Sequence, residues 1–267
     1  MTESLPAAWL TYADYTGHTP GHTVSGAVVV LPGVYSPQLD NQRDLLVYLP
    51  PGYASGHDRY PVVYMQDGQN LFDSATAFGG QEWQVDETLE ALSTEGLAAI
   101  VVGLPHMGPA RLAEYNPFPA RGGRGEAYLD FIVQTVKPMI DGAFRTRPER
   151  EATGVLGSSL GGLISVYGFF RYSAVFGFAG GLSPAFWYAG RNLYAFLQRS
   201  PHLPGCLYLD RGSRERGGAQ RVAKLLVQRG YVLGRDLCYL EEEGGEHNER
   251  AWARRLPGAL RFLLPRA

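Results

Sequence analysis

Residues 152–172 read ATGVLGSSLGGLISVYGFFRY. Inside this stretch, Gly157-Ser158-Ser159-Leu160-Gly161 fits the G-x-S-x-G pattern, in which a strand turns sharply into a helix and presents a serine at the turn. A short apolar run, residues 153–156, precedes the pattern, and apolar residues recur behind it at helical spacing. The stretch therefore predicts Ser159 as a nucleophile at the carboxyl end of a strand.

Outside this stretch, apolar runs alternate with helical patterns along the chain. The runs that predict strands cover residues 22–31, 43–49, 61–65, 98–102, 176–182, 206–210 and 236–241. The helical patterns cover residues 85–93, 128–140, 190–199, 217–229 and 248–264. Pro138 is expected to kink or end the second of these helices. The alternation predicts an α/β fold, with a mostly parallel sheet of about eight strands, an antiparallel pair at its first edge and helices on both faces. In such a sheet the ligand site lies at the carboxyl ends of the strands.

The composition is typical of a globular protein. Of the 267 residues, 45% are hydrophobic and 19% are charged, and no linker divides the chain, so we expect a single domain over residues 1–267. The net charge of -2 offers no positive field to nucleic acid or to an anionic membrane surface. No apolar run could span a bilayer and residues 1–20 lack a signal-peptide pattern, so we expect a cytoplasmic protein. No Cys or His spacing typical of a metal site occurs, and we expect neither a metal nor a cofactor.

A serine nucleophile needs a general base, which is normally a histidine oriented by a carboxylate. In the G-x-S-x-G class the chain order is serine, acid, histidine. Two histidines, His202 and His247, follow Ser159, and no acidic residue lies between Ser159 and His202. His247 follows the last predicted strand, in a loop that can bring its ring over the serine. We therefore expect His247 to be the base.

The acid has two candidates. Seven acidic residues lie between Ser159 and His247, but most are placed at the wrong end of a strand or in a solvated glutamate run. Asp210 and Glu215 both lie at the carboxyl end of the strand predicted over residues 206–210. The sequence pattern leaves these two alternatives open.

Acyl transfer also needs two hydrogen-bond donors for the developing oxyanion. In the G-x-S-x-G class one is the backbone N–H after the nucleophile, here that of Leu160, and the other comes from the loop after an early strand. Residues 65–70, MQDGQN, form that loop, and Gln69 follows its glycine.

A second loop, residues 105–125, has no periodicity and is rich in Pro, Gly and Arg. Loops of this length are uncommon in compact domains and are often functional. Because the loop follows a strand at the expected site, its arginines, Arg111, Arg121 and Arg124, could meet an anionic group of a substrate. We expect Arg111 and Asp67 to contact the substrate.

With these residues assembled, the chain resembles the putative esterase branch of the α/β-hydrolases, which includes esterase D or S-formylglutathione hydrolase, feruloyl and acetylxylan esterases, enterochelin esterases and antigen 85 acyltransferases. The matching stretches are residues 36–43, 47–53, 64–72, 157–162, 183–187 and 244–247. The resemblance implies the α/β-hydrolase fold. It also implies that the acid closes the segment Gly212-Ser213-Arg214-Glu215, which favours Glu215 over Asp210, that Gln69 supplies the second oxyanion donor, and that Trp187 lies near the acyl pocket.

The sequence thus predicts a carboxylic ester hydrolase that acts on a small-molecule ester with Ser159, Glu215 and His247. One alternative is acyl transfer to an alcohol or sugar by the same three residues. A further alternative, which the complete set of residues disfavours, is a binding protein that kept the fold without the activity.

Overall fold

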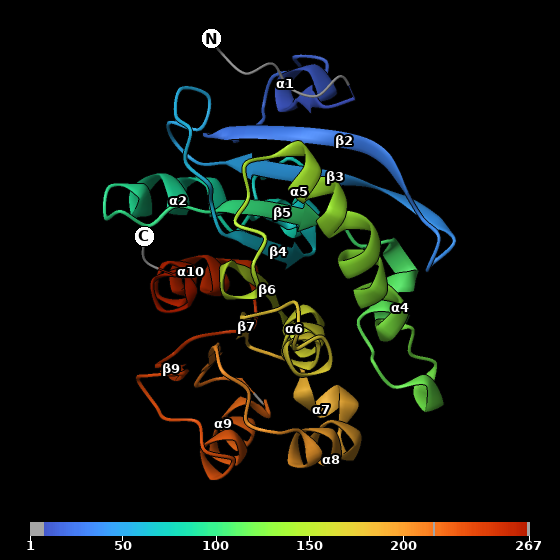
Figure 1. Cartoon of the computed structure of the whole chain (residues 1–267), viewed down its shortest axis with the longest axis vertical. Helices are drawn as coiled ribbons and strands as arrows, with labels where there is room; N and C mark the ends of the chain where they lie inside the picture. The colour runs from blue at the N-terminus through green and yellow to red at the C-terminus, as the bar shows by residue number, and fades with distance from the viewer. Residues whose placement is uncertain (1–7, 216, 266–267) are drawn as a thin grey trace.

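The computed structural model describes residues 8–215 and 217–265, and one mixed sheet runs through them (Figure 1). The strand order is β1-β2-β3-β5-β4-β6-β7-β8-β9, from the blue edge to the orange edge of the figure. The strands are β1 (Leu10–Thr11), β2 (Ala27–Ser36), β3 (Asn41–Leu49), β4 (Val62–Gln66), β5 (Ile100–Leu104), β6 (Thr153–Ser158), β7 (Phe178–Leu182), β8 (Cys206–Gly212) and β9 (Leu237–Glu242). The α/β class predicted from the alternation of patterns is confirmed, with nine strands in place of about eight.

The sheet has an antiparallel edge and a parallel remainder. The pairs β1–β2, β2–β3 and β3–β5 are antiparallel, whereas all pairs from β5 to β9 are parallel. Strands β4 to β7 are buried along their whole length, as apolar runs covered by helices on both faces must be. The carboxyl ends of the parallel strands therefore lie together along one side of the sheet.

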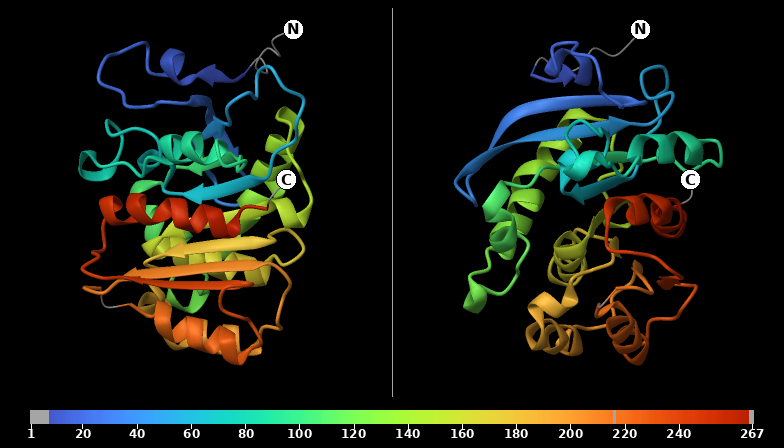
Figure 2. Two further views of the ribbon diagram at one scale, coloured as in Figure 1. Left: turned by 90° about the vertical axis from the view of Figure 1, so that its left-hand side faces the viewer. Right: turned by 180° about the vertical axis from the view of Figure 1, so that it is seen from behind.

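Helices cover both faces of the sheet (Figure 2). Helices α1 (Tyr12–Tyr15), α2 (Val85–Ser93) and α10 (Glu249–Leu263) pack on one face. The other face is covered by α4 (Gly125–Asp130), η5 (Phe131–Val136), α5 (Lys137–Ala143), α6 (Ser159–Arg171), α8 (Arg191–Arg199) and α9 (Ala219–Gln228). The short helix α7 (Phe186–Ala189) follows β7. No helix in the described part of the chain is long and apolar enough to cross a membrane.

The helix around Pro138 continues past the proline. Its middle part, η5, is a π-helical turn, and α5 continues to Ala143 with Pro138 at its second position. Proline removes one backbone donor and crowds the carbonyl of the preceding turn. The π-helical turn lies directly before Pro138, where the proline interrupts the regular helical hydrogen bonds. Pro138 therefore distorts the helix and does not end it.

The segment 105–125 contains short helical turns in place of the structureless loop that its composition suggests. These are η3 (Gly108–Ala110), α3 (Arg111–Glu114) and η4 (Pro119–Arg121). A buried ion pair joins Glu114 to Arg43 of β3 at 3.0 Å, with both side chains almost fully enclosed. This pair fixes the segment against the sheet, and the segment in turn holds Arg111 beside the site.

Candidate active site

Ser159 stands at the junction of β6 and α6, in the sharp turn that its sequence pattern predicts. Its backbone φ is 52°, a left-handed conformation that is unusual for a residue other than glycine. The glycines around it are sterically required: a Cβ at Gly157 would lie 2.5 Å from Oε1 of Gln66 and 2.8 Å from the carbonyl carbon of Gly161. The turn therefore closes tightly and leaves the serine hydroxyl at its tip.

His247 reaches the serine from the turn between β9 and α10. Its Nε2 lies 3.0 Å from Oγ of Ser159, and its Nδ1 lies 3.0 Å from Oε2 of Glu215. The ring packs edge-on against Trp252, with 5.1 Å between centroids. The Asn248 side chain caps the start of α10 by accepting from the Ala251 N–H. These contacts set the orientation of the imidazole.

Glu215 lies in the turn after β8, where its side chain is nearly enclosed. Its Oε1 accepts hydrogen bonds from the Ser183 hydroxyl at 2.7 Å and the Gly212 N–H at 2.8 Å. Burial alone would raise the pKa of Glu215, but the hydrogen bonds from His247, Ser183 and Gly212 together hold that pKa below its ordinary value. The carboxylate is therefore ionised at neutral pH and can stabilise a protonated imidazole.

Hydrogen bonds join the turn that carries Glu215 to the turn that carries His247. The Arg214 N–H donates to the Gly245 carbonyl at 3.2 Å, and the Gly244 N–H donates to the Ser213 hydroxyl at 2.8 Å. A Cβ at Gly212 would lie 2.1 Å from the Gly245 oxygen, so only glycine allows this approach. Two segments separated by about thirty residues are thus held together at the end of the sheet.

Asp210, the other candidate acid, does not contact His247. It is fully buried on β8 and accepts from the Ser183 N–H at 2.8 Å and the Tyr208 hydroxyl at 3.1 Å, while Arg255 of α10 lies 3.2 Å away. Burial raises the pKa of Asp210 to about 7, against the opposing effect of Arg255. Asp210 therefore contacts residues that surround Glu215, namely Ser183 and Arg255. It is not part of the hydrogen-bonded series Glu215–His247–Ser159.

Two residues that the sequence reasoning missed, Ser183 and Arg255, complete that support. The Ser183 hydroxyl, besides donating to Glu215, accepts from Trp252 Nε1 at 3.0 Å and from Arg255 Nη2 at 2.7 Å. Arg255 also lies 3.3 Å from Glu242. The one signal in the sequence was an arginine placed among the apolar positions of a helix, because such a residue must find carboxylates inside the protein.

The turn after β4 lies against the turn that carries Ser159. Gln69 is in η1 (Gly68–Asn70), and a Cβ at Gly68 would lie 2.6 Å from the carbonyl carbon of Gly103 in β5. A Cβ at Gly161 would lie 3.1 Å from Cβ of Gln66, so the two turns touch. The Leu160 N–H is in the first turn of α6, where backbone donors have no partner within the helix. That the N–H groups of Gln69 and Leu160 both point at one oxyanion stays a prediction.

Arg111 and Asp67 contact each other. Nε and Nη2 of Arg111 each lie 2.7 Å from a carboxylate oxygen of Asp67, and the guanidinium lies 5.0 Å from the centre of the Tyr115 ring. The Asp67 N–H donates to the Tyr115 hydroxyl at 3.1 Å. The arginine that we expected to meet an anionic group therefore already has a carboxylate partner, and the pair braces the turn that carries Gln69.

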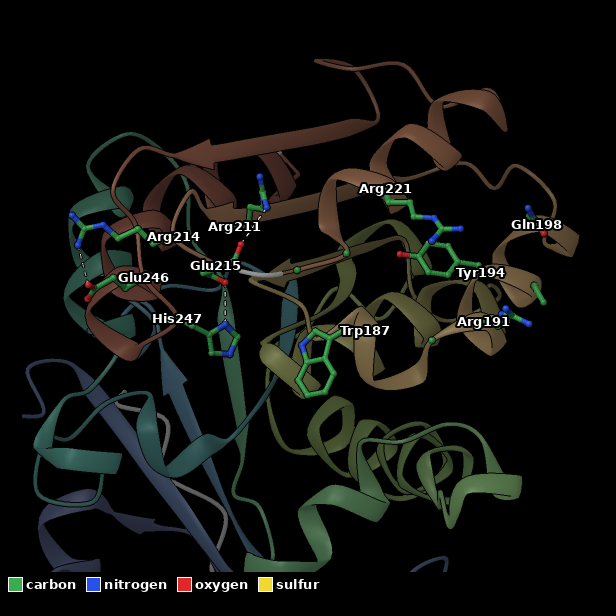
Figure 3. A pocket seen from close by; sticks show the side chains of 14 residues that line it. Trp187, Arg191, Tyr194, Gln198, Arg211, Arg214, Glu215, Arg221, Glu246 and His247 are labelled. Carbon is green, nitrogen blue, oxygen red and sulfur yellow. Dashed lines mark hydrogen bonds and ion pairs between the residues drawn. The ribbon is translucent and has the colours of Figure 1, made fainter.

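An open hollow of about 1580 Å³ adjoins His247 and Glu215 (Figure 3). Trp187, on α7, lines it with 65% of its surface exposed. The exposed indole forms part of the wall of this hollow, where it is accessible to a ligand. Trp187 therefore lies at the hollow beside His247, and its contact with the substrate stays a prediction.

One acidic group, apart from this site, could hold a cation. Carboxylate oxygens of Glu82, Asp86 and Glu87, around the start of α2, lie within 4.8 Å of one another. Burial, together with Asp86, raises the pKa of Glu87 to about 8. The raised pKa of Glu87 lowers the negative charge of this cluster at neutral pH. Among the described residues, no hydrogen bond or ion pair joins the cluster to Ser159 or His247.

The family model described as Putative esterase matches residues 36–263. The protein of Bacillus subtilis (strain 168) named "Uncharacterized protein YbbA" is 29% identical over 254 residues, which cover 86% of this chain and 96% of that protein.

Two solved structures have the same fold. The BES protein from Bacillus cereus matches with a TM-score of 0.67 at 20% identity, over 99% of this chain and 98% of that chain. The ferric enterobactin esterase (fes) from Salmonella typhimurium matches with a TM-score of 0.71 at 18% identity, over 89% of this chain and 58% of that chain. At such identities the likeness concerns the fold, and the fold is that of the α/β-hydrolases.

Proposed function

Because this chain belongs to the Putative esterase family and is a carboxylic ester hydrolase, we propose that it cleaves its substrate with Ser159 as nucleophile, His247 as general base and Glu215 as the orienting acid. The observation that carries the proposal is the chain of two 3.0 Å contacts from Ser159 through His247 to Glu215. A neutral imidazole that donates from Nδ1 to Glu215 has Nε2 free to accept the serine proton.

The reaction has two halves. Ser159 Oγ attacks the ester carbonyl while His247 Nε2 takes its proton, and the N–H groups of Leu160 and Gln69 stabilise the oxyanion. His247 then gives the proton to the departing alcohol, which leaves an acyl group on Ser159. Water, deprotonated by His247, attacks this acyl group, and the acid is released with the enzyme restored.

Labelling with a fluorophosphonate probe tests the assignment of the nucleophile. We expect the probe to modify the wild-type protein on the peptide that contains Ser159, as detected by mass spectrometry, because only an activated serine reacts rapidly. The Ser159→Ala variant should stay unlabelled, whereas Ser55→Ala, which removes an exposed serine in a turn, should label normally. Labelling of another serine, or of the Ser159→Ala variant, would overturn the proposal.

A further inference from the structure

The hollow beside His247 is lined by positive charge. Among the residues that the structure describes, four arginines and two glutamates line it, so their summed charge is opposite in sign to the net charge of -2 of the whole chain. A concave surface with an excess of positive charge attracts negatively charged ligands. The hollow therefore favours a negatively charged substrate.

The four arginines differ in their partners. Arg211 lies 2.9 Å from Glu241, and Arg214 lies 3.2 Å from Glu246. Arg191 and Arg221 are exposed and have no carboxylate partner among the described residues. These two guanidinium groups are consequently free to bind an anion.

Arg221 packs on the ring of Tyr194, and Arg191 lies about one helical turn from Tyr194 on α8. The guanidinium of Arg221, on α9, is 4.2 Å from the centre of the Tyr194 ring, a distance at which the ring stabilises the cation and orients it. Arg191 and Tyr194 are three residues apart on α8 and so share a face of that helix. In Figure 3, Trp187 lies between these three side chains and His247. The indole is thus placed to contact a ligand that extends from the arginines to the histidine.

We propose that Arg191, Tyr194 and Arg221 form a subsite for the anionic end of an aromatic ester, with Trp187 against its ring and the ester group at Ser159. The inference rests on the proposed function, because it places the scissile bond at Ser159. Guanidinium groups bind a carboxylate through paired, planar hydrogen bonds. Stacking of an aromatic ring on an exposed indole orients the remainder of the ligand.

A pair of esters that differ only in charge tests the subsite. The probes are 4-acetoxybenzoate, which is an anion at neutral pH, and its neutral methyl ester. For a variant with both Arg191→Ala and Arg221→Ala, we expect kcat/KM to fall about tenfold for the anion and to stay within twofold for the methyl ester, because two partly exposed ion pairs are lost. For each ester, kcat/KM of the variant is divided by kcat/KM of the wild type, so that the intrinsic reactivity of the ester cancels. Arg261→Ala, which removes an exposed arginine paired with Glu95, is the matched control and should change neither value.

Equal losses for both esters, or no loss for the anion, would overturn the subsite. A binding measurement separates this outcome from a failure of the proposed function. Calorimetry with Ser159→Ala and the product 4-hydroxybenzoate should show binding that weakens about tenfold when both arginines are also replaced, whether or not Ser159 is the nucleophile. Absence of binding at millimolar concentrations, or binding unaffected by the arginines, would contradict the inference.

Discussion

Glu215 and Asp210 differ in what their carboxylates contact, and this difference predicts different effects of substitution. Glu215→Gln removes the charge that stabilises the His247 imidazolium, so we expect kcat to fall by about 10³–10⁴-fold. Asp210→Asn alters a buried carboxylate that touches Ser183, Tyr208 and Arg255, and kcat should fall less than tenfold. Steady-state hydrolysis of p-nitrophenyl acetate measures both values. A large loss in the Asp210 variant alone would show that the acid is misassigned.

Ser183 acts through Glu215, since its hydroxyl donates to Oε1 of that residue. In Ser183→Ala, Trp252 Nε1 and Arg255 lose a buried acceptor, which should lower the free energy of unfolding by about 1–3 kcal/mol. Looser positioning of Glu215 should also lower kcat about tenfold with little change in KM. The free energy of unfolding and kcat are measured well below the melting temperature. Ser200→Ala, which alters another buried serine, is the control. A loss of stability with unchanged kcat would mean that Ser183 is only structural.

The short helix η1 contains Gln69, so its position determines where the Gln69 N–H points. A Cβ in Gly68→Ala would meet the backbone of Gly103 and Leu104 at 2.6–2.8 Å, so the turn must shift. Removal of one oxyanion donor costs about 10²–10³-fold in kcat in serine hydrolases, and we expect a loss of about 10²-fold here.

Gly258→Ala is the matched control for Gly68→Ala. Nothing lies within 4 Å of a Cβ at Gly258, which is inside α10, and alanine there should stabilise the helix by up to about 1 kcal/mol without changing kcat. Unchanged kcat in Gly68→Ala would argue against an oxyanion role for this turn.

The acidic start of α2 should make stability depend on pH. The pKa of Glu87 is raised to about 8 from an ordinary value of 4.5, so the folded protein binds more protons than the unfolded chain between these values. The free energy of unfolding should therefore fall as pH rises from about 4.5 to 8. Glu87→Gln should flatten this slope in urea unfolding curves, and the exposed Glu243→Gln should not. An unchanged slope in Glu87→Gln would contradict the assignment.

At the scale of the whole molecule, local patterns determined most of the elements. The helix expected over residues 85–93 is α2 as observed, because its apolar residues follow the helical period without interruption. The two-residue strand β1 is too short to carry any pattern and was missed. The effect of Pro138 was only partly predicted, since the preceding π-helical turn absorbs the proline within a continuous helix.

The interactions that support the site could not be predicted in this way, because they join distant segments. Asp210 lies near the end of β8 and Glu215 lies in the turn that follows. The hydrogen bonds between the turns after β8 and β9 bring Glu215, and not Asp210, to His247. The pairing of Arg111 with Asp67 spans 44 residues, and no local pattern indicates that these two charges would neutralise each other.

The turnover of p-nitrophenyl acetate by the Ser159→Ala variant tests whether Ser159 attacks the ester. We expect kcat to fall by about 10⁵–10⁶-fold while the melting temperature changes little, because the loss of the nucleophile removes the covalent pathway. A kcat within tenfold of the wild-type value in a folded variant would contradict the account.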